Sequence, residues 1–303
     1  HLQPLLAEAN LFDAWITVGS GPQKVRTNIQ RIREGQFDLA IILPHSFRTA
    51  WETWRAGVPR RIGMARQWRS CLLSDPLKMP RLAPGRRAYP MHHEYLEVVA
   101  TLGVDGDGEG SQLAASEDCR LRAQERWQRW SISEDRPWVG LNPGAAFGPS
   151  KIWPLDRLAR VAKELRDVDG CEIVITCGPG EEELAQDLEA RIDGPVINLA
   201  AGLWPLDELK VLMEKLALLI TGDTGPRHIA AGMSTPQVVL MGPTSPDYTD
   251  AFLETTTVIR KQIDCSPCQK KVCPLGHHQC MKAIEPEEVL AAARSWLAKK
   301  PQS

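Results

Sequence analysis

The chain has 303 residues, of which 43% are hydrophobic and 24% are charged, and its formal net charge is -2 with a pI near 6.4. A slightly acidic chain lacks the excess of Lys and Arg on which a general nucleic-acid binder depends, so an anionic ligand must be met by a local site. At about 150 residues per domain the length predicts two domains, and no stretch approaches the ~20 apolar residues of a membrane span.

The first residue is His1 and not Met, and residues 2–6 look like the middle of a structural element, so we expect an N-terminal portion to be missing. No signal-peptide pattern is present at this end. Eight cysteines are too few for a disulfide-stapled secreted scaffold and favour a reducing cytoplasm.

The N-terminal half predicts α/β structure from its short aliphatic runs and its amphipathic segments. The expected strands are 14–18, 39–43 and 61–64, and the expected helices are 25–33, 91–102 and 119–130. Residues 105–116 are rich in Gly, Asp and Ser and predict a linker. We expect an N-terminal domain over 1–133, a C-terminal domain over 134–284 and a terminal helical segment over 285–303.

Basic residues are locally enriched after the expected strand 39–43, although the whole chain is slightly acidic. One interpretation is ordinary solvated surface, and the sharper one is a subset that faces a cleft and binds an anionic acceptor. The stretch contains His45, Ser46, Arg48, Arg55, Arg60, Arg61, Arg66 and Arg69.

The C-terminal half alternates strands and amphipathic helices regularly, which predicts a parallel sheet with helices on both faces. The expected strands are 138–142, 172–177, 196–199, 218–221 and 237–241, and the clearest apolar stripes lie at 155–165 and 206–216. Ligands bind such sheets at the carboxyl ends of the strands. Three turns fall there, and they begin at Asn142, Gly178 and Asp223.

The segment Asp223-Thr224-Gly225-Pro226-Arg227-His228 joins an apolar run to a helix with Pro in its first turn. First-turn amides and the helix dipole favour an anion there, by about 0.3–1 kcal/mol per charge when exposed. The segment therefore predicts a phosphate-binding turn that presents Thr224, Gly225 and His228. An ordinary Rossmann-like turn is the equally weighted alternative.

Two further loops are candidates. Residues 142–154 combine the small residues Gly144 and Ala145 with Lys151 before a helix, which suits a phosphate, although a solvated Lys in a connecting loop fits as well. After Gly178, three consecutive acids at 181–183 begin a helix. Helix-dipole complementarity explains these acids, and ribose binding is the minority interpretation.

Four of the eight cysteines, Cys265, Cys268, Cys273 and Cys280, lie within sixteen residues together with His277 and His278. This density favours a structural metal such as zinc, although the spacing matches no standard zinc finger. A disulfide or redox pair and unliganded thiols are the alternatives.

Several motifs, in family order over nearly the whole chain, resemble the bacterial lipopolysaccharide heptosyltransferases, most closely the type II enzymes. They are Leu43-Pro44-His45-Ser46-Phe47-Arg48, Gly57-Val58-Pro59-Arg60-Arg61-Ile62-Gly63, Asn142-Pro143-Gly144-Ala145 with Lys151-Ile152-Trp153-Pro154, Asp223-Thr224-Gly225 with His228, and Gly242-Pro243-Thr244-Ser245-Pro246. The cysteine loop resembles a segment found in some members.

The resemblance implies an α/β GT-B fold, in which two Rossmann-like domains with parallel sheets face each other across a cleft and the C-terminal helix returns toward the N-terminal domain. It implies an inverting transfer of heptose from ADP-heptose to the inner core of lipopolysaccharide, with no metal at the reaction centre. It also implies a cytoplasmic enzyme with peripheral contact at the inner face of the membrane.

Carried over by position, the donor site comprises Gly144, Ala145, Lys151, Asp223, Thr224, Gly225 and His228. One of the acids 181–183 would bind the adenosine ribose, and we select Glu182. The anionic acceptor would meet Ser46, Arg48, Arg60 and Arg61.

One departure concerns the general base, which in the family is an acidic residue in a glycine-containing loop after the first strand. Nothing here matches that loop, and Asp13 precedes a candidate strand instead of following one. A non-catalytic nucleotide-sugar or glycan-binding protein is therefore the second hypothesis, and a UDP-sugar epimerase of related architecture is the third.

Overall fold

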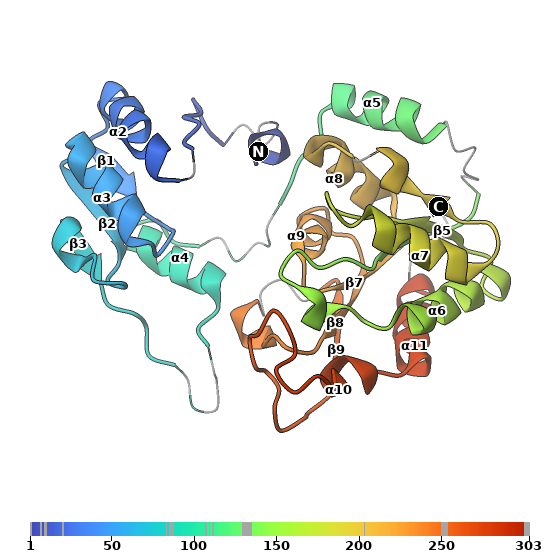
Figure 1. Cartoon of the computed structure of the whole chain (residues 1–303). Helices are drawn as coiled ribbons and strands as arrows, with labels where there is room; N and C mark the ends of the chain where they lie inside the picture. The colour runs from blue at the N-terminus through green and yellow to red at the C-terminus, as the bar shows by residue number, and fades with distance from the viewer. Residues whose placement is uncertain are drawn as a thin grey trace. The chain divides into compact units, whose positions relative to one another are not determined.

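The chain is described by a computed structural model, shown in Figure 1. It describes residues 2–6, 8, 11–19, 21–82, 84, 88–106, 108, 110, 112–128, 135–202, 204–249 and 254–299. The chain forms two compact units: unit 1 is His1–Leu11, Gly110–Pro246 and Phe252–Ser303, and unit 2 is Phe12–Glu109 with Asp247–Ala251. The boundary predicted between residues 133 and 134 lies outside the described residues and stays a prediction, whereas the two units divide near residue 110.

Unit 2 is built on a three-stranded parallel sheet of order β1-β2-β3. Ser46 caps the second of its helices by accepting from the amide of Thr49 at 3.3 Å, and Gly57 ends that helix with a φ of 88°, which suits glycine. Its strands are β1 (Leu39–Ile41), β2 (Arg60–Met64) and β3 (Asp75–Leu77), and its helices are α2 (Val25–Glu34), α3 (Phe47–Ala56) and α4 (Met91–Ala100).

Two elements of unit 2, α3 and β3, were not predicted from the sequence. The strand predicted over 14–18 is wrong, because these residues pair with no strand of the described structure. Instead the side-chain amide of buried Asn28 bonds both the N–H and the C=O of Gly19, each at 3.0 Å. A side chain thus satisfies the backbone that a neighbouring strand would otherwise satisfy.

Unit 1 contains a six-stranded parallel sheet of order β6-β5-β4-β7-β8-β9. All five residues of β4 and of β8 are buried, as expected for strands covered on both faces. The strands are β4 (Trp138–Asn142), β5 (Glu172–Ile175), β6 (Ile197–Asn198), β7 (Leu218–Gly222), β8 (Gln237–Met241) and β9 (Thr256–Arg260), of which only β9 was not predicted. The helices are α1 (Gln3–Leu6), α5 (Glu117–Gln128), α6 (Leu155–Asp167), α7 (Glu182–Ile192), α8 (Leu206–Lys215), α9 (Gly225–Gly232), α10 (Gln279–Lys282) and α11 (Pro286–Leu297).

The two faces of this sheet are covered by different helices (Figure 1). Leu158 and Leu165 of α6 pack with α7 and α11 on one face, while Val211 and Leu212 of α8 pack with α5 and α9 on the other. Burying each such side chain contributes about 1.5–3 kcal/mol, so the sheet is a rigid base for the loops at its edge. Because α11 packs on α6 within unit 1, the expected return toward the N-terminal domain stays a prediction.

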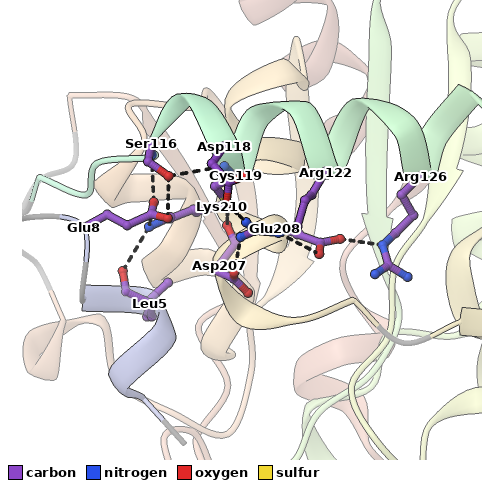
Figure 2. A network of polar contacts seen from close by, with 10 residues as sticks. All are labelled: Leu5, Glu8, Ser116, Asp118, Cys119, Arg122, Arg126, Asp207, Glu208 and Lys210. Carbon is purple, nitrogen blue, oxygen red and sulfur yellow. Dashed lines mark hydrogen bonds and ion pairs between the residues drawn. The ribbon is translucent and has the colours of Figure 1, made fainter.

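A polar network ties α1 and α5 to α8 (Figure 2). The Lys210 ammonium is fully buried and lies 2.8 Å from a carboxylate oxygen of Glu8, which also accepts from the amide of Ser116 at 2.8 Å. Arg122 of α5 pairs with Asp207 of α8 at 2.9 Å. These contacts place residues before and after unit 2 in one packed structure with α8.

Among the described helices, none is long and apolar enough to cross a membrane.

Candidate functional site

The predicted donor loops meet at the point where the strand order of unit 1 reverses. Strands β4 and β7 are neighbours, and Asn142 at the end of β4 is in register with Thr221 of β7. From β4 the order runs to β5 and β6 on one side and to β7 and β8 on the other. In such sheets the ligand binds outside the carboxyl ends at this switch point.

A cation and a carboxylate from the two loops contact each other there. Nζ of Lys151 lies 2.8 Å from Oδ2 of Asp223 and 2.7 Å from its carbonyl oxygen. The other carboxylate oxygen, Oδ1, accepts from Arg227 at 2.8 Å, and Oδ2 also accepts from the hydroxyl of Thr244 at 2.9 Å. Both side chains of the Lys151 and Asp223 pair are mostly buried, at 9% and 12% exposure.

Opposing effects set the charge of Asp223. Burial acts to raise the pKa of this carboxyl, but the hydrogen bond and charge of Lys151, with the charge of Arg227 and the hydroxyl of Thr244, lower it below its usual value. The carboxylate is therefore ionised near neutral pH, and two cations converge on it. An anionic ligand here would meet fixed positive charge without a metal ion.

The N-terminus of α9 adds backbone donors. Thr224 is the N-cap with no side-chain cap bond, Pro226 follows within the first turn, and a Cβ on Gly225 would meet nothing within 4 Å. The first-turn amides can therefore be approached by a phosphate. Desolvation and the charge of Arg227 lower the pKa of His228, so its imidazole, which keeps an exposed edge, is neutral near pH 7.

Asn142 links the two loops. Its side-chain amide donates to the hydroxyls of Thr221 at 3.2 Å and Thr224 at 3.1 Å. The amide therefore holds the N-cap of α9 against the end of β4. From the sequence alone, an Asn at a strand end is typical of an ordinary turn. Its two partners could not be predicted, because they depend on the register between β4 and β7.

The loop that carries Lys151 rests on residues 270–271 of the cysteine segment. The hydroxyl of Ser150 donates to the carbonyl of Lys270 at 2.6 Å, and the amide of Ser150 donates to the carbonyl of Lys271 at 3.1 Å. Gly148 has a φ of 147°, and a Cβ there would meet the Lys271 carbonyl oxygen at 2.6 Å. Lys151 is thus positioned by two segments far apart in the sequence.

Of the three consecutive acids, Glu181 approaches the phosphate loop. Its carboxylate accepts from the amide of Gly178 at 2.8 Å, and a Cβ on Gly144 would meet that carboxylate at 2.0–2.5 Å. Glu182 instead accepts from the amide of Gly180 at 3.1 Å in its own turn. A shallow hollow beside this turn is lined by Ala145, Gly148, Pro149, Ile152, Gly180, Glu181, Glu183, Leu184 and Asp187.

The sequence pattern of glycosyltransferase family 9 (heptosyltransferase) matches residues 25–279, which is most of the chain. The chain belongs to this family. It is therefore a glycosyltransferase, and the enzyme class predicted from the sequence is confirmed. The predicted GT-B class of α/β fold with parallel sheets is confirmed as well.

Relatives in family 9 cover most of the chain. Lipopolysaccharide heptosyltransferase 2 of Escherichia coli K12 is 31% identical over 86% of this chain and 75% of its own length, and lipooligosaccharide heptosyltransferase 2 of Haemophilus ducreyi is 30% identical over 98% and 88%. The solved E. coli ADP-heptose lps heptosyltransferase II has a TM-score of 0.72 at 28% identity, covering 91% of this chain and 81% of that one. A family 9 glycosyl transferase from Veillonella parvula has a TM-score of 0.81 at 26% identity, covering 99% and 86%.

The four residues predicted to bind the acceptor in this family 9 chain do not come together. Ser46 and Arg48 begin α3, just after the carboxyl end of β1, whereas Arg60 and Arg61 begin β2 and so lie toward the amino edge of the same sheet. Arg61 donates to the carbonyl of Leu72 at 2.7 Å and to those of neighbouring residues. Its Nε and Nη1 donors are thus used within the fold, and a role for all four residues in acceptor binding stays a prediction.

The four cysteines of the cysteine segment gather around one small cavity. Cys265, Cys268, Cys273 and Cys280 line one small cavity with His277 and His278. Amides of His278, Leu275, Gly276 and His277 donate to Cys273 and lower its pKa. Within the described ranges no group of three or more His, Cys, Asp or Glu side chains is arranged to hold a metal ion, so the predicted structural zinc is not supported. The thiols are free.

Proposed function

We propose that the chain transfers heptose from ADP-heptose to the inner core of lipopolysaccharide, with inversion at the anomeric carbon and without a metal at the reaction centre. The names of its relatives, lipopolysaccharide and lipooligosaccharide heptosyltransferase 2, support this sugar and this class of acceptor. The observation that carries the proposal is the Lys151 and Asp223 pair beside the amides of α9 at the switch point.

In this reaction an acceptor hydroxyl oxygen attacks C1 of the heptose while the bond from C1 to the diphosphate oxygen breaks. ADP leaves with the electron pair, and the hydroxyl proton passes to a base that we assign to no residue of this chain. Lys151 and the first-turn amides of α9 would meet the charge that develops on the diphosphate. Fixed donors aimed at developing charge are an effective form of transition-state stabilisation.

The same geometry supports a proposal for the remaining donor contacts. Gly144, Ala145, Thr224 and Gly225 would leave room for the diphosphate, and Asp223 and His228 would lie beside the sugar. For the adenosine ribose the predicted residue is Glu182, but the contact of Glu181 with the phosphate loop supports Glu181 as the better candidate. We also propose that the enzyme is cytoplasmic and meets its acceptor at the inner face of the membrane.

The deciding experiment is a transfer assay with purified protein, deacylated inner-core lipopolysaccharide and ADP-, UDP- or GDP-heptose, with the product followed by mass spectrometry. We expect a mass gain of one heptose with the ADP sugar. Binding of ADP-heptose without any product would instead support the second hypothesis, a non-catalytic nucleotide-sugar-binding protein. The epimerase hypothesis has only a likeness of fold, since UDP-GlcNAc 2-epimerase from Methanocaldococcus jannaschii is 10% identical with a TM-score of 0.55.

A further inference from the structure

The loop that follows β2 in unit 2 has an unusual backbone. Gln67 and Trp68 are consecutive residues with φ values of 51° and 62°. This left-handed region is disfavoured for residues that carry a Cβ, and least expected for a bulky side chain. Such a conformation persists only where surrounding contacts fix it, and it is concentrated at functional sites.

Arg69 provides those contacts. Its side chain is fully buried, and its guanidinium donates to the carbonyls of Met64 at 2.9 Å, Ile42 at 3.5 Å and Pro44. These three carbonyls lie at the carboxyl ends of β1 and β2 or just beyond them. The guanidinium therefore fixes the loop to the edge of the sheet where α/β folds bind ligands.

The same loop holds Trp68 in the solvent, with 95% of its surface exposed. An indole prefers to bury its large apolar face, as Trp138 does, and even the exposed Trp54 keeps more than half of its surface covered, at 43% exposure. A strained backbone that presents an unburied aromatic ring at a ligand-binding edge suggests that the ring is covered by a ligand.

Polar groups surround the base of this loop. Nε2 of His45 contacts a carboxylate oxygen of Glu94, and NH1 of Arg66 lies 3.4 Å from Nδ1 of His45. Glu94 is 4% exposed in its side chain, whereas Arg66 is exposed. Arg66 and Arg69 carry two positive charges against the one carboxylate of Glu94, so the edge favours an anionic group.

We propose that Trp68, Arg66 and His45 form a subsite for an acidic sugar of the acceptor. The indole would stack on the apolar face of the sugar ring, and Arg66, oriented by His45, would bind the phosphate or carboxylate that the sugar carries. The subsite rests on the proposed function for the identity of the acceptor. In this proposal the acceptor is bound by residues at the carboxyl edge of the sheet, and not by Arg60 and Arg61 at its amino edge.

The test measures binding of deacylated inner-core oligosaccharide by calorimetry, without donor and without turnover. We expect Trp68→Ala and Arg66→Ala each to weaken binding about tenfold, which corresponds to about 1.4 kcal/mol. The matched controls are Trp54→Ala and Arg26→Ala, which remove exposed side chains of the same types from α3 and α2. Thermal melts check folding, and ADP affinity should be unchanged in all four variants.

Unchanged oligosaccharide affinity in Trp68→Ala overturns the subsite while the proposed transfer stands. Conversely, loss of oligosaccharide binding in this variant supports the subsite even if the wild-type chain yields no heptosylated product, in which case the proposed function fails. A third arm uses phosphatidylglycerol vesicles that lack saccharide. If Trp68→Ala loses vesicle binding and keeps oligosaccharide binding, the indole is a membrane anchor and the subsite is wrong.

Discussion

Nζ of Lys151 bridges two atoms of Asp223, the Oδ2 oxygen at 2.8 Å and the carbonyl oxygen at 2.7 Å. Lys151 follows β4 and Asp223 follows β7, so the two loops predicted separately from the sequence form one site at the switch point. The ammonium is thereby held where a diphosphate would compete with Asp223 for it.

Replacing Lys151 by Ala should weaken ADP binding by about tenfold to a hundredfold, because a charge-assisted hydrogen bond contributes about 1.5–3 kcal/mol. Isothermal calorimetry with ADP measures the change. Lys282→Ala removes an exposed ammonium from α10 in the same unit and should leave the affinity unaltered. Equal affinities of wild type and Lys151→Ala would show that the site lies elsewhere.

The ionisation of Asp223 should make the free energy of unfolding depend on pH. Since the folded-state pKa of this carboxyl is lowered, the unfolded chain binds its proton first as the pH falls, and unfolding is favoured. The contribution is complete above the unfolded pKa of about 3.9 and is lost as the pH falls through the lower folded pKa. Urea titrations of wild type and Asp223→Asn between neutral pH and pH 3 should give a difference in the free energy of unfolding that is constant near neutral pH and begins to shrink only as the pH falls below about 4. A constant difference over the whole range would contradict the lowered pKa.

Gly148→Ala should destabilise the chain by about 1–3 kcal/mol, because the new Cβ would meet the Lys271 carbonyl at 2.6 Å and the φ of 147° disfavours a side chain. Moving this loop also displaces Lys151, so ADP affinity should fall together with the melting temperature. Gly202→Ala is the matched control, since its Cβ would meet nothing within 4 Å. If Gly148→Ala matched this control in both measurements, the cysteine segment would not position the Lys151 loop.

Glu8→Gln should lower the free energy of unfolding by about 1–3 kcal/mol. The fully buried ammonium of Lys210 then loses its paired carboxylate, and an uncompensated buried charge is costly. The double variant Glu8→Gln with Lys210→Met should recover much of that loss, because no charge remains buried. Glu125→Gln, an exposed change on α5, gives the reference value in the same denaturant titration. If the double variant lost as much free energy of unfolding as Glu8→Gln and Lys210→Met alone do together, the pair in Figure 2 would not be coupled.

The sequence predicts the parts of the fold that depend on local pattern. Strands β4 and β8 have the predicted bounds, because both are short, mostly apolar segments between turns. Residues 14–18 carry a similar local pattern but form no strand in the described structure, since a strand requires a partner that no local pattern supplies. Helix α3 was not predicted, because its arginines were interpreted only as part of a basic cluster. Ser46 and Gly57 are nevertheless the cap residues that mark its ends.

The site was predictable only as far as its loops. The Asp223 turn and the Lys151 loop were identified from glycine, proline and charge, but the pairing of Lys151 with Asp223 depends on which strands are neighbours. Choosing among Glu181, Glu182 and Glu183 from the sequence is equally limited, since adjacent helix-start residues differ in direction by about 100°. Arg60 and Arg61 were grouped with Ser46 because they are close in sequence. In the sheet, however, Ser46 follows the carboxyl end of β1, whereas Arg60 and Arg61 begin the neighbouring parallel strand β2 at the opposite edge.

The contact between Glu8 and Lys210 also determines which fragments of this enzyme can be expected to fold. A fragment that starts at Gly110 would retain α8 and the nucleotide loops but would leave the buried Lys210 ammonium without its counter-ion Glu8. Expressing the donor half alone would then require either residues 2–8 supplied as a separate peptide or a neutral side chain at position 210.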